Sequence, residues 1–162
     1  MAHCVHSNEA EQELMLRRGV YIAHSPESNM NLASGVAPVN QFIDRGLHVG
    51  LATDVAGGSH ESMLKAMMHA IQASKLRWRL LDQNVKPLSF ERAFYLATMG
   101  GGQFFGKVGS FLDGYELDAV VLDDENLEHP QQLSPRARLE RMVYLADERN
   151  ICAKFVSGRK IL

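Results

Sequence analysis

Three side chains capable of metal or acid–base chemistry stand at the predicted ends of successive strands. His3 follows a short apolar start, His24 ends the apolar run 20–24, and Asp54 follows the apolar run 47–52. Because the carboxyl ends of parallel strands open on one side of an α/β fold, these three side chains would face one mouth. Imidazole and carboxylate groups bind metals and carry protons. The spacing therefore leaves open a metal site, an acid–base site, or separate structural roles.

The other potential reactive groups are interpreted as structural. This interpretation covers the remaining histidines, which are His6, His48, His60, His69 and His129. Gly57 and Gly58 belong to neither a GxGxxG pattern nor a GKS or GKT pattern, so no phosphate loop is predicted there. Cys4 neighbours His3, but adjacent residues on a strand point to opposite faces, which disfavours a Cys–His pair.

Helical and strand-like patterns alternate over the first hundred residues. Ser7 is the expected cap of a first helix that ends at Gly19, and Pro38 is expected in the first turn of another helix that ends before Gly46. Further helices are expected at 61–76 and 90–98, strands at 20–24 and 47–52, and a loop at 25–35. Continuous apolar strands between helices predict a parallel sheet with crossover helices.

The pattern changes after the glycine run 100–102, which is expected to break or bend the chain. Turn signals then surround an apolar strand at 119–122, and a helical pattern covers 134–145. The last residues predict a hairpin that turns at Ser157 and Gly158. A small β element with a helix is therefore expected from residue 107 onward.

Composition narrows the class of protein. The chain has 162 residues, a net charge of −2 and 46% hydrophobic residues, which favours a single soluble domain without nucleic-acid or membrane partners. Two cysteines form no disulfide framework, and the first residues lack the features of a signal peptide. A cytoplasmic location is expected.

Several motifs, in this order and at these separations, carry a resemblance to a known family. These motifs are MAHCVHS, IAHSPESNMNLASGVAPV and VGLATDVAGG. Together they resemble the second half of a deaminase of the amidohydrolase superfamily. The stretches LATMGGGQFFG and YLADERNI are most similar to the guanine deaminases within it. Cytosine deaminases, adenosylhomocysteine-type deaminases and triazine hydrolases are the related groups.

The resemblance implies an α/β fold, the C-terminal half of a (β/α)8 metal-dependent hydrolase barrel. Residues 1–106 would supply strands six to eight, and residues 107–162 would supply part of a small β domain. The family aspartate on strand eight matches Asp54, a ligand of one zinc or iron ion that also transfers protons. His3 matches the strand-six histidine, which lies beside the metal without binding it. His24 begins the strand-seven motif, which shapes the loop under the site.

The implied reaction is the conversion of guanine and water to xanthine and ammonia. A divalent metal supplies hydroxide at neutral pH, and hydroxide attacks the amino-bearing carbon of the purine. Asp54 would accept the proton of the water and pass it toward the leaving ammonia. His3 would stabilise the charge that develops in the tetrahedral intermediate. Gly57 and Gly58 would let the backbone turn close to the metal.

Part of the family's site is missing from this sequence. The HxH pair of the first barrel strand and the ligand histidine of the fifth are absent. We therefore expect an incomplete chain that starts at an internal methionine, and a missing N-terminal half or a homo-oligomer that covers the open sheet edge. Two alternatives stay open, which are an amidohydrolase acting on another aminated heterocycle and a non-catalytic half-barrel remnant.

Overall fold

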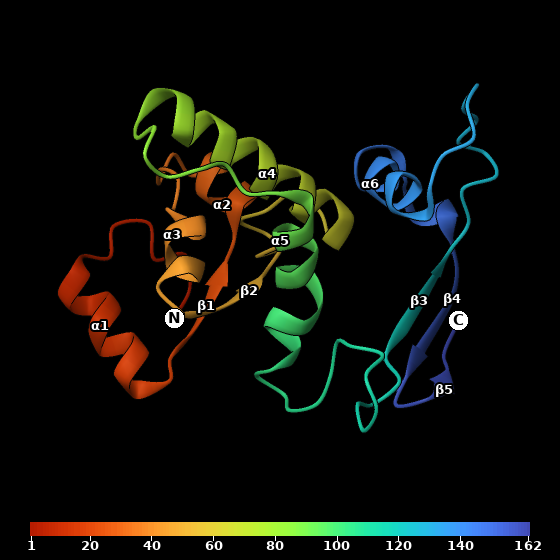
Figure 1. Ribbon diagram of the computed structural model, residues 1–162, viewed down its shortest axis with the longest axis horizontal. Coiled ribbons are helices and arrows are strands. Elements are labelled where there is room, and N and C mark those ends of the chain that lie inside the picture. The colour runs from red at the N-terminus through yellow and green to blue at the C-terminus, as the bar shows by residue number, and fades with distance from the viewer.

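The computed structural model describes residues 1–162 (Figure 1). Capping residues set both ends of the first helix. Helix α1 (Glu9–Arg18) is capped by Asn8, whose side chain accepts from the Glu11 N–H while the Glu11 carboxylate accepts from the Asn8 N–H. The prediction of Ser7 as the cap is wrong by one residue, because Asn8 completes this reciprocal pair. Gly19 ends the helix at φ +61°, as expected.

A short parallel sheet forms the centre of the first part of the chain. Strands β1 (Tyr21–His24) and β2 (His48–Leu51) pair in parallel, with Tyr21 opposite His48. Ala2 adds a single parallel bridge to Ala23, on β1. This arrangement confirms the predicted parallel sheet, and Figure 1 shows β1 and β2 side by side.

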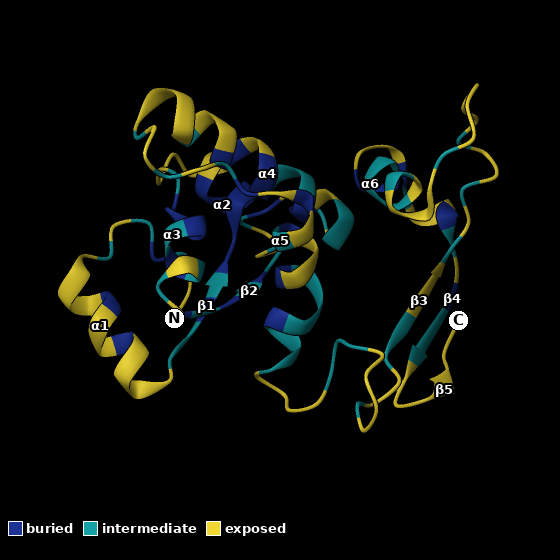
Figure 2. Cartoon of the chain, in the orientation of Figure 1, coloured by how far each residue is buried: buried dark blue, intermediate teal, exposed yellow.

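Helices bury the apolar residues of this sheet. Helix α3 (Val39–Asp44) contributes Phe42, and the long helix α4 (Met63–Leu80) contributes Ala70 and Ile71 to a core that also contains Ile22 and Val49. Figure 2 shows the buried residues gathered along β1, β2 and the helix faces turned toward them. Helix α4 extends four residues beyond its predicted end at 76. These last residues are largely exposed, so no apolar periodicity marked them as helical.

The segment predicted as a loop at 25–35 contains a helix instead. Helix α2 (Pro26–Asn31) begins directly after β1, with Pro26 in its first turn, where a missing N–H costs nothing. The Ser25 carbonyl accepts from the Asn29 N–H at 3.1 Å, and the Ser28 carbonyl accepts from the Leu32 N–H at 3.0 Å. The sequence predicted a loop because this segment is polar, a composition typical of exposed loops. In the structure its polar residues Glu27, Ser28 and Asn29 are buried in a helix.

The glycine run does not break the chain. Helix α5 (Phe90–Tyr95) continues into a π-helical turn (Leu96–Gly100), and the helix persists through residue 102. A Cβ on Gly50 would lie 2.8 Å from the Cα of Gly101, and one on Gly100 would lie 2.6 Å from the Val49 carbonyl oxygen. The glycines therefore serve close packing of this helix against β2.

The last third of the chain forms an antiparallel sheet and a helix. Strands β3 (Ala119–Leu122), β4 (Ile151–Val156) and β5 (Arg159–Lys160) pair in that order, and the predicted hairpin at Ser157 and Gly158 is confirmed. Helix α6 (Pro135–Leu145) and a 3-10 turn (Glu148–Asn150) precede β4. Val143 of α6 joins the main core beside α4, so the division at residue 107 stays a prediction (Figure 1).

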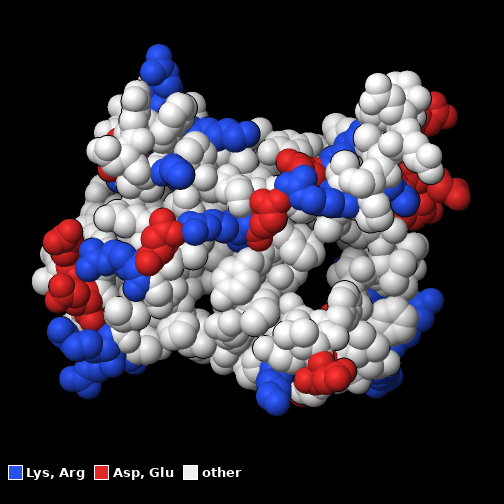
Figure 3. All heavy atoms as spheres, viewed as in Figure 1, with Lys and Arg blue, Asp and Glu red and all other residues white.

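Charges of both signs are intermingled on the face shown in Figure 3. Ion pairs join neighbouring helices, since Arg92 of α5 contacts Asp44 of α3 at 2.7 Å and Arg136 of α6 contacts Glu91 of α5. No helix is both long enough and apolar enough to cross a membrane.

Candidate active site

His3 and Asp54 meet at the carboxyl ends of the parallel segments. The His3 N–H donates to the Ala23 carbonyl at 2.9 Å, which ties the first segment to the end of β1. Asp54 follows β2 by three residues. Nε2 of His3 lies 3.7 Å from Oδ2 of Asp54, and the two side chains are 38% and 42% exposed. Two of the three side chains expected at one mouth, His3 and Asp54, therefore lie together there and are accessible from outside.

Asn29 fixes the orientation of the His3 ring. Nδ1 of His3 lies 2.8 Å from Oδ1 of Asn29. Since an amide oxygen only accepts, this contact assigns the proton of the neutral ring to Nδ1. Nε2 then presents a lone pair toward the Asp54 carboxylate. Such a pair of acceptors is suited to share a proton or a cation. The direct contact between Asn29 and His3 was missed by sequence reasoning, although Asn29 lies in a motif that had been singled out.

Both residues adopt a backbone conformation that side chains other than glycine rarely use. His3 has φ +64° and Asp54 has φ +53°. The Asp54 carbonyl accepts from the Gly58 N–H at 2.6 Å and closes a tight turn. Residues held in the left-handed region cluster at functional sites, where the surrounding structure compensates their cost.

Gly57 and Gly58 each sit against a carboxylate. A Cβ on Gly57 would lie 2.5 Å from Oγ of Ser28 and 2.9 Å from Oδ2 of Asp54. A Cβ on Gly58 would lie 2.1 Å from the Thr53 carbonyl oxygen and 3.2 Å from Oε2 of Glu27. Each glycine leaves room for groups that a side chain would displace.

His24 lies behind the mouth and contacts neither partner of the His3–Asp54 pair through a hydrogen bond. It is 2% exposed, and both of its ring nitrogens lack hydrogen-bond partners. Burial, together with a smaller effect of charge on His3, lowers the pKa of His24 to about 4. His24 is therefore neutral at pH 7, and its assigned part in shaping the loop stays a prediction.

The donor types at the mouth fit part of a metal site. Zinc takes four nitrogen, oxygen or sulfur ligands, and Asp54 offers a carboxylate oxygen next to the imidazole of His3. Three potential ligands within reach of one another occur elsewhere in the chain, not here. His3 and Asp54 together offer fewer than the four ligands that a zinc ion takes.

A second polar cluster, formed by Glu27, His60 and His69, was not predicted. Their ligand atoms lie within 4.8 Å of one another. Burial alone would raise the pKa of Glu27, but the hydrogen bonds from Ser59, and to a smaller extent the charges of His60 and His69, lower this pKa overall. Burial lowers the pKa of His69 more than Glu27 raises it. Sequence spacing gave no signal, because α2 and the start of α4 are more than thirty residues apart.

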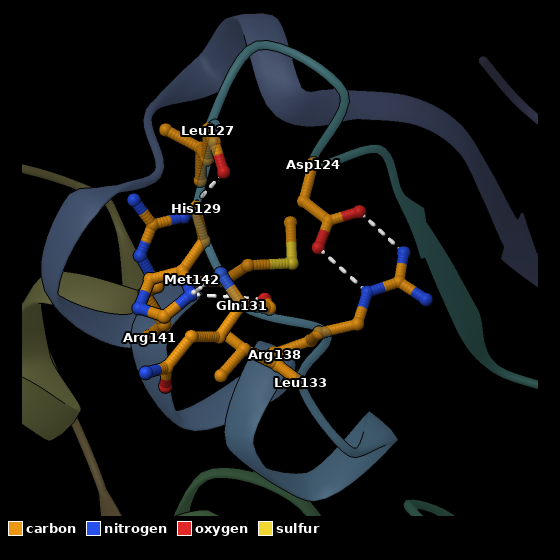
Figure 4. Close-up of a pocket in the computed structure, with 8 residues that line it drawn as sticks. All are labelled: Asp124, Leu127, His129, Gln131, Leu133, Arg138, Arg141 and Met142. Atoms are coloured by element: carbon orange, nitrogen blue, oxygen red, sulfur yellow. Dashed lines mark hydrogen bonds and ion pairs between the residues drawn. The ribbon is translucent and has the colours of Figure 1, made fainter.

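A small pocket beside α6 offers no free reactive group. Figure 4 shows its eight lining residues, among them Asp124, Arg138 and Arg141. Both Asp124 oxygens accept from Arg138, and Arg141 donates to the Leu127 and Glu128 carbonyls. Neither His3 nor Asp54 lines it. These mutual contacts indicate that the pocket's polar groups stabilise the loop before α6.

Comparison with known proteins places the chain in a family. The model of the amidohydrolase family matches residues 1–161. The chain belongs to the amidohydrolase family. A guanine deaminase of Dictyostelium discoideum is 33% identical to this amidohydrolase over 99% of the chain. The solved guanine deaminase of C. acetobutylicum with bound guanine in its active site is 45% identical over the whole chain, with a TM-score of 0.94.

These relatives are longer than the present amidohydrolase chain, which spans 37% and 38% of their respective lengths. A zinc-bound adenosine deaminase of Xanthomonas campestris is 26% identical over 98% of the chain, with a TM-score of 0.81. The chain covers 36% of that structure. The fold is thus a mixed α/β fragment that matches part of the amidohydrolase deaminases.

Proposed function

We propose that this chain supplies part of the active site of a zinc-dependent guanine deaminase, which converts guanine and water to xanthine and ammonia. The observation that carries the proposal is the approach of His3 Nε2 to Asp54 Oδ2 at 3.7 Å, at the ends of parallel strands. The similarity to two guanine deaminases, one of them with bound guanine, supports the choice of substrate.

The proposal assigns residues 1–106 to strands six, seven and eight of a (β/α)8 barrel. The extended segment at Ala2, then β1 and β2, would be these strands in order. Residues 107–162 would contribute to a small β domain. The parallel pairing and the crossover helices support this assignment, since active sites of such barrels lie at the carboxyl ends of the strands.

Asp54 would bind the zinc or iron ion and accept the proton of the attacking water, and then help to deliver it to the leaving ammonia. When bound, the metal lowers the pKa of a water molecule to about 7 and makes a nucleophile available at neutral pH. His3, held by Asn29, would accept a hydrogen bond from the attacking water at Nε2, and once protonated there it would stabilise negative charge that develops on the substrate. The His3 side chain is 38% exposed, so it is accessible to a substrate.

The remaining ligands would come from an N-terminal half or from a homo-oligomer. Two observations support this part of the proposal. No group of three potential metal ligands includes Asp54, and the chain spans only 37% of the length of the Dictyostelium relative. A cytoplasmic location belongs to the same proposal, and it is supported by two free cysteines, Cys4 and Cys152.

A chimera tests the proposal directly. The N-terminal segment of the C. acetobutylicum enzyme, up to the matched part, is joined to this chain and assayed for xanthine and ammonia with guanine as substrate. Adenosine, cytosine and an aminated triazine complete the substrate panel. Turnover with guanine preferred supports the proposal. A folded chimera that prefers another heterocycle overturns the substrate, and a folded but inactive one indicates a non-catalytic half-barrel.

A further inference from the structure

The cluster joins Glu27 of α2, His69 of α4 and His60 of the segment before α4. Helices α2 and α4 pack against each other (Figure 1). We propose that these three side chains form a second metal site, which binds a divalent transition-metal ion such as zinc. The site shares no ligand with the mouth at Asp54. The inference goes beyond the proposed deaminase function and does not depend on it.

The distances within the cluster suit one small ion. Nε2 of His60 lies 3.2 Å from Oε2 of Glu27, and Nδ1 of His69 lies 3.9 Å from Oε1 of Glu27. Two ligand atoms bound to one tetrahedral zinc ion are about 3.3 Å apart, given metal–ligand distances of about 2.0–2.1 Å. All three ligand atoms lie within 4.8 Å of one another, and a zinc ion held by three side chains would take water as its fourth ligand.

The imidazole nitrogens are otherwise without partners. Both ring nitrogens of His60 and Nδ1 of His69 are buried and make no hydrogen bond. Buried polar atoms in native proteins nearly always have a partner, so three such atoms beside one carboxylate require an explanation. A bound cation supplies it for Nε2 of His60 and Nδ1 of His69, because it accepts a lone pair from each ring and one from the carboxylate at once.

Protonation of the two rings explains the cluster less well. The rings of His60 and His69 are stacked, with centroids 5.3 Å apart and planes 26° from parallel. Two imidazolium ions at this separation would repel each other, and one Glu27 carboxylate would have to neutralise both. One divalent ion between neutral rings removes that repulsion.

The carboxylate of Glu27 is already oriented for binding. Ser59 donates its backbone N–H to Oε2 at 3.1 Å and its hydroxyl to Oε1. Hydrogen bonds of this kind orient ligand side chains and raise metal affinity. Since Ser59 follows Gly57 and Gly58, an ion here would also fasten the loop that carries Asp54.

Zinc titration of the 162-residue chain tests the site. All variants are made in an Asp54→Asn background, which removes the ligand expected at the other mouth. After removal of metal by chelation, calorimetry is expected to show one zinc ion bound per chain. His60→Gln or His69→Gln is expected to weaken binding about 100-fold or more, and Ser59→Ala about 10- to 100-fold. His129→Gln, a histidine exposed near α6, is the matched control and is expected to bind unchanged.

A second measurement avoids dependence on the folding of the variants. In the unmodified chain, ring ¹⁵N resonances of His60 and His69 are expected to shift together until one equivalent of zinc is added. Shifts confined to other histidines, or the absence of zinc binding, would overturn the proposal. Unchanged affinity in folded His60→Gln and His69→Gln proteins would overturn it equally.

Discussion

The side-chain amide of Asn29, 26 residues away in the sequence, orients the His3 ring. Its Nδ1 contacts Oδ1 of Asn29, which leaves Nε2 directed toward Asp54. In the active chimera, His3→Gln is expected to lower kcat about 100- to 1,000-fold, the usual loss when one stabilising group is removed. Steady-state kinetics with guanine measure this effect, and His129→Gln is the control. A kcat within tenfold of the unsubstituted chimera would remove His3 from the assigned role.

His24 is expected to make stability depend on pH. Because burial lowers its pKa to about 4, the unfolded chain binds more protons than the folded chain between about pH 6.5 and 4. The stability gained from neutral His24 is complete above about pH 6.5 and is lost as the pH falls, by roughly 3 kcal/mol at pH 4. Urea unfolding at several pH values measures this, and His24→Asn is expected to flatten the slope. An equal slope in both proteins would contradict the assigned cause.

The sequence predicted part of this site because strand ends can be read from apolar runs. His3 and Asp54 follow such runs, and from this and the family resemblance the sequence predicted that both lie at one mouth. In the structure their side chains lie 3.7 Å apart. The partner of His3, Asn29, could not be predicted from the pattern, because hydrogen bonds between elements depend on their packing. The Glu27, His60 and His69 cluster was missed for the same reason.

At the scale of elements, the packing of the helix 90–102 against β2 depends on glycine. A Cβ on Gly50 would lie 2.8 Å from Cα of Gly101, whereas the nearest contact of a Cβ on Gly101 would be 3.5 Å, to the Leu96 carbonyl oxygen. Gly50→Ala is therefore expected to destabilise the chain by about 1–3 kcal/mol through overpacking. Gly101→Ala, in a helix, is expected to stay within about 1 kcal/mol of the parent. Chemical denaturation compares them, and equal effects would show that the close approach is unimportant.

Element prediction succeeded where periodicity was long and failed where the chain was short or unusual. Helix α4 and both parallel strands follow their apolar patterns, while α2 consists of buried polar residues that imitate a loop. The glycine run predicted a break or bend in the chain. In the structure these glycines let the helix 90–102 pack closely against β2, which the sequence pattern alone could not show.

For the whole molecule, the open parallel sheet predicts association. β2 pairs only with β1, so its other edge lacks a strand partner. Phe104, Phe105 and Phe111 are also largely exposed. Unpaired edges and exposed apolar side chains favour binding to another chain. Size-exclusion chromatography with light scattering of the free chain is expected to show a dimer or a larger species. A clean monomer over a range of concentrations would contradict this expectation.

The central claim is the proposal that Asp54 belongs to the active site of a guanine deaminase of which this chain forms part. The most direct measurement is the rate of xanthine formation by the chimera, with and without Asp54→Asn. The account predicts turnover of guanine in the parent and its nearly complete loss in the variant, because Asp54 is proposed to serve both metal binding and proton transfer. Equal rates in two folded proteins would contradict the account.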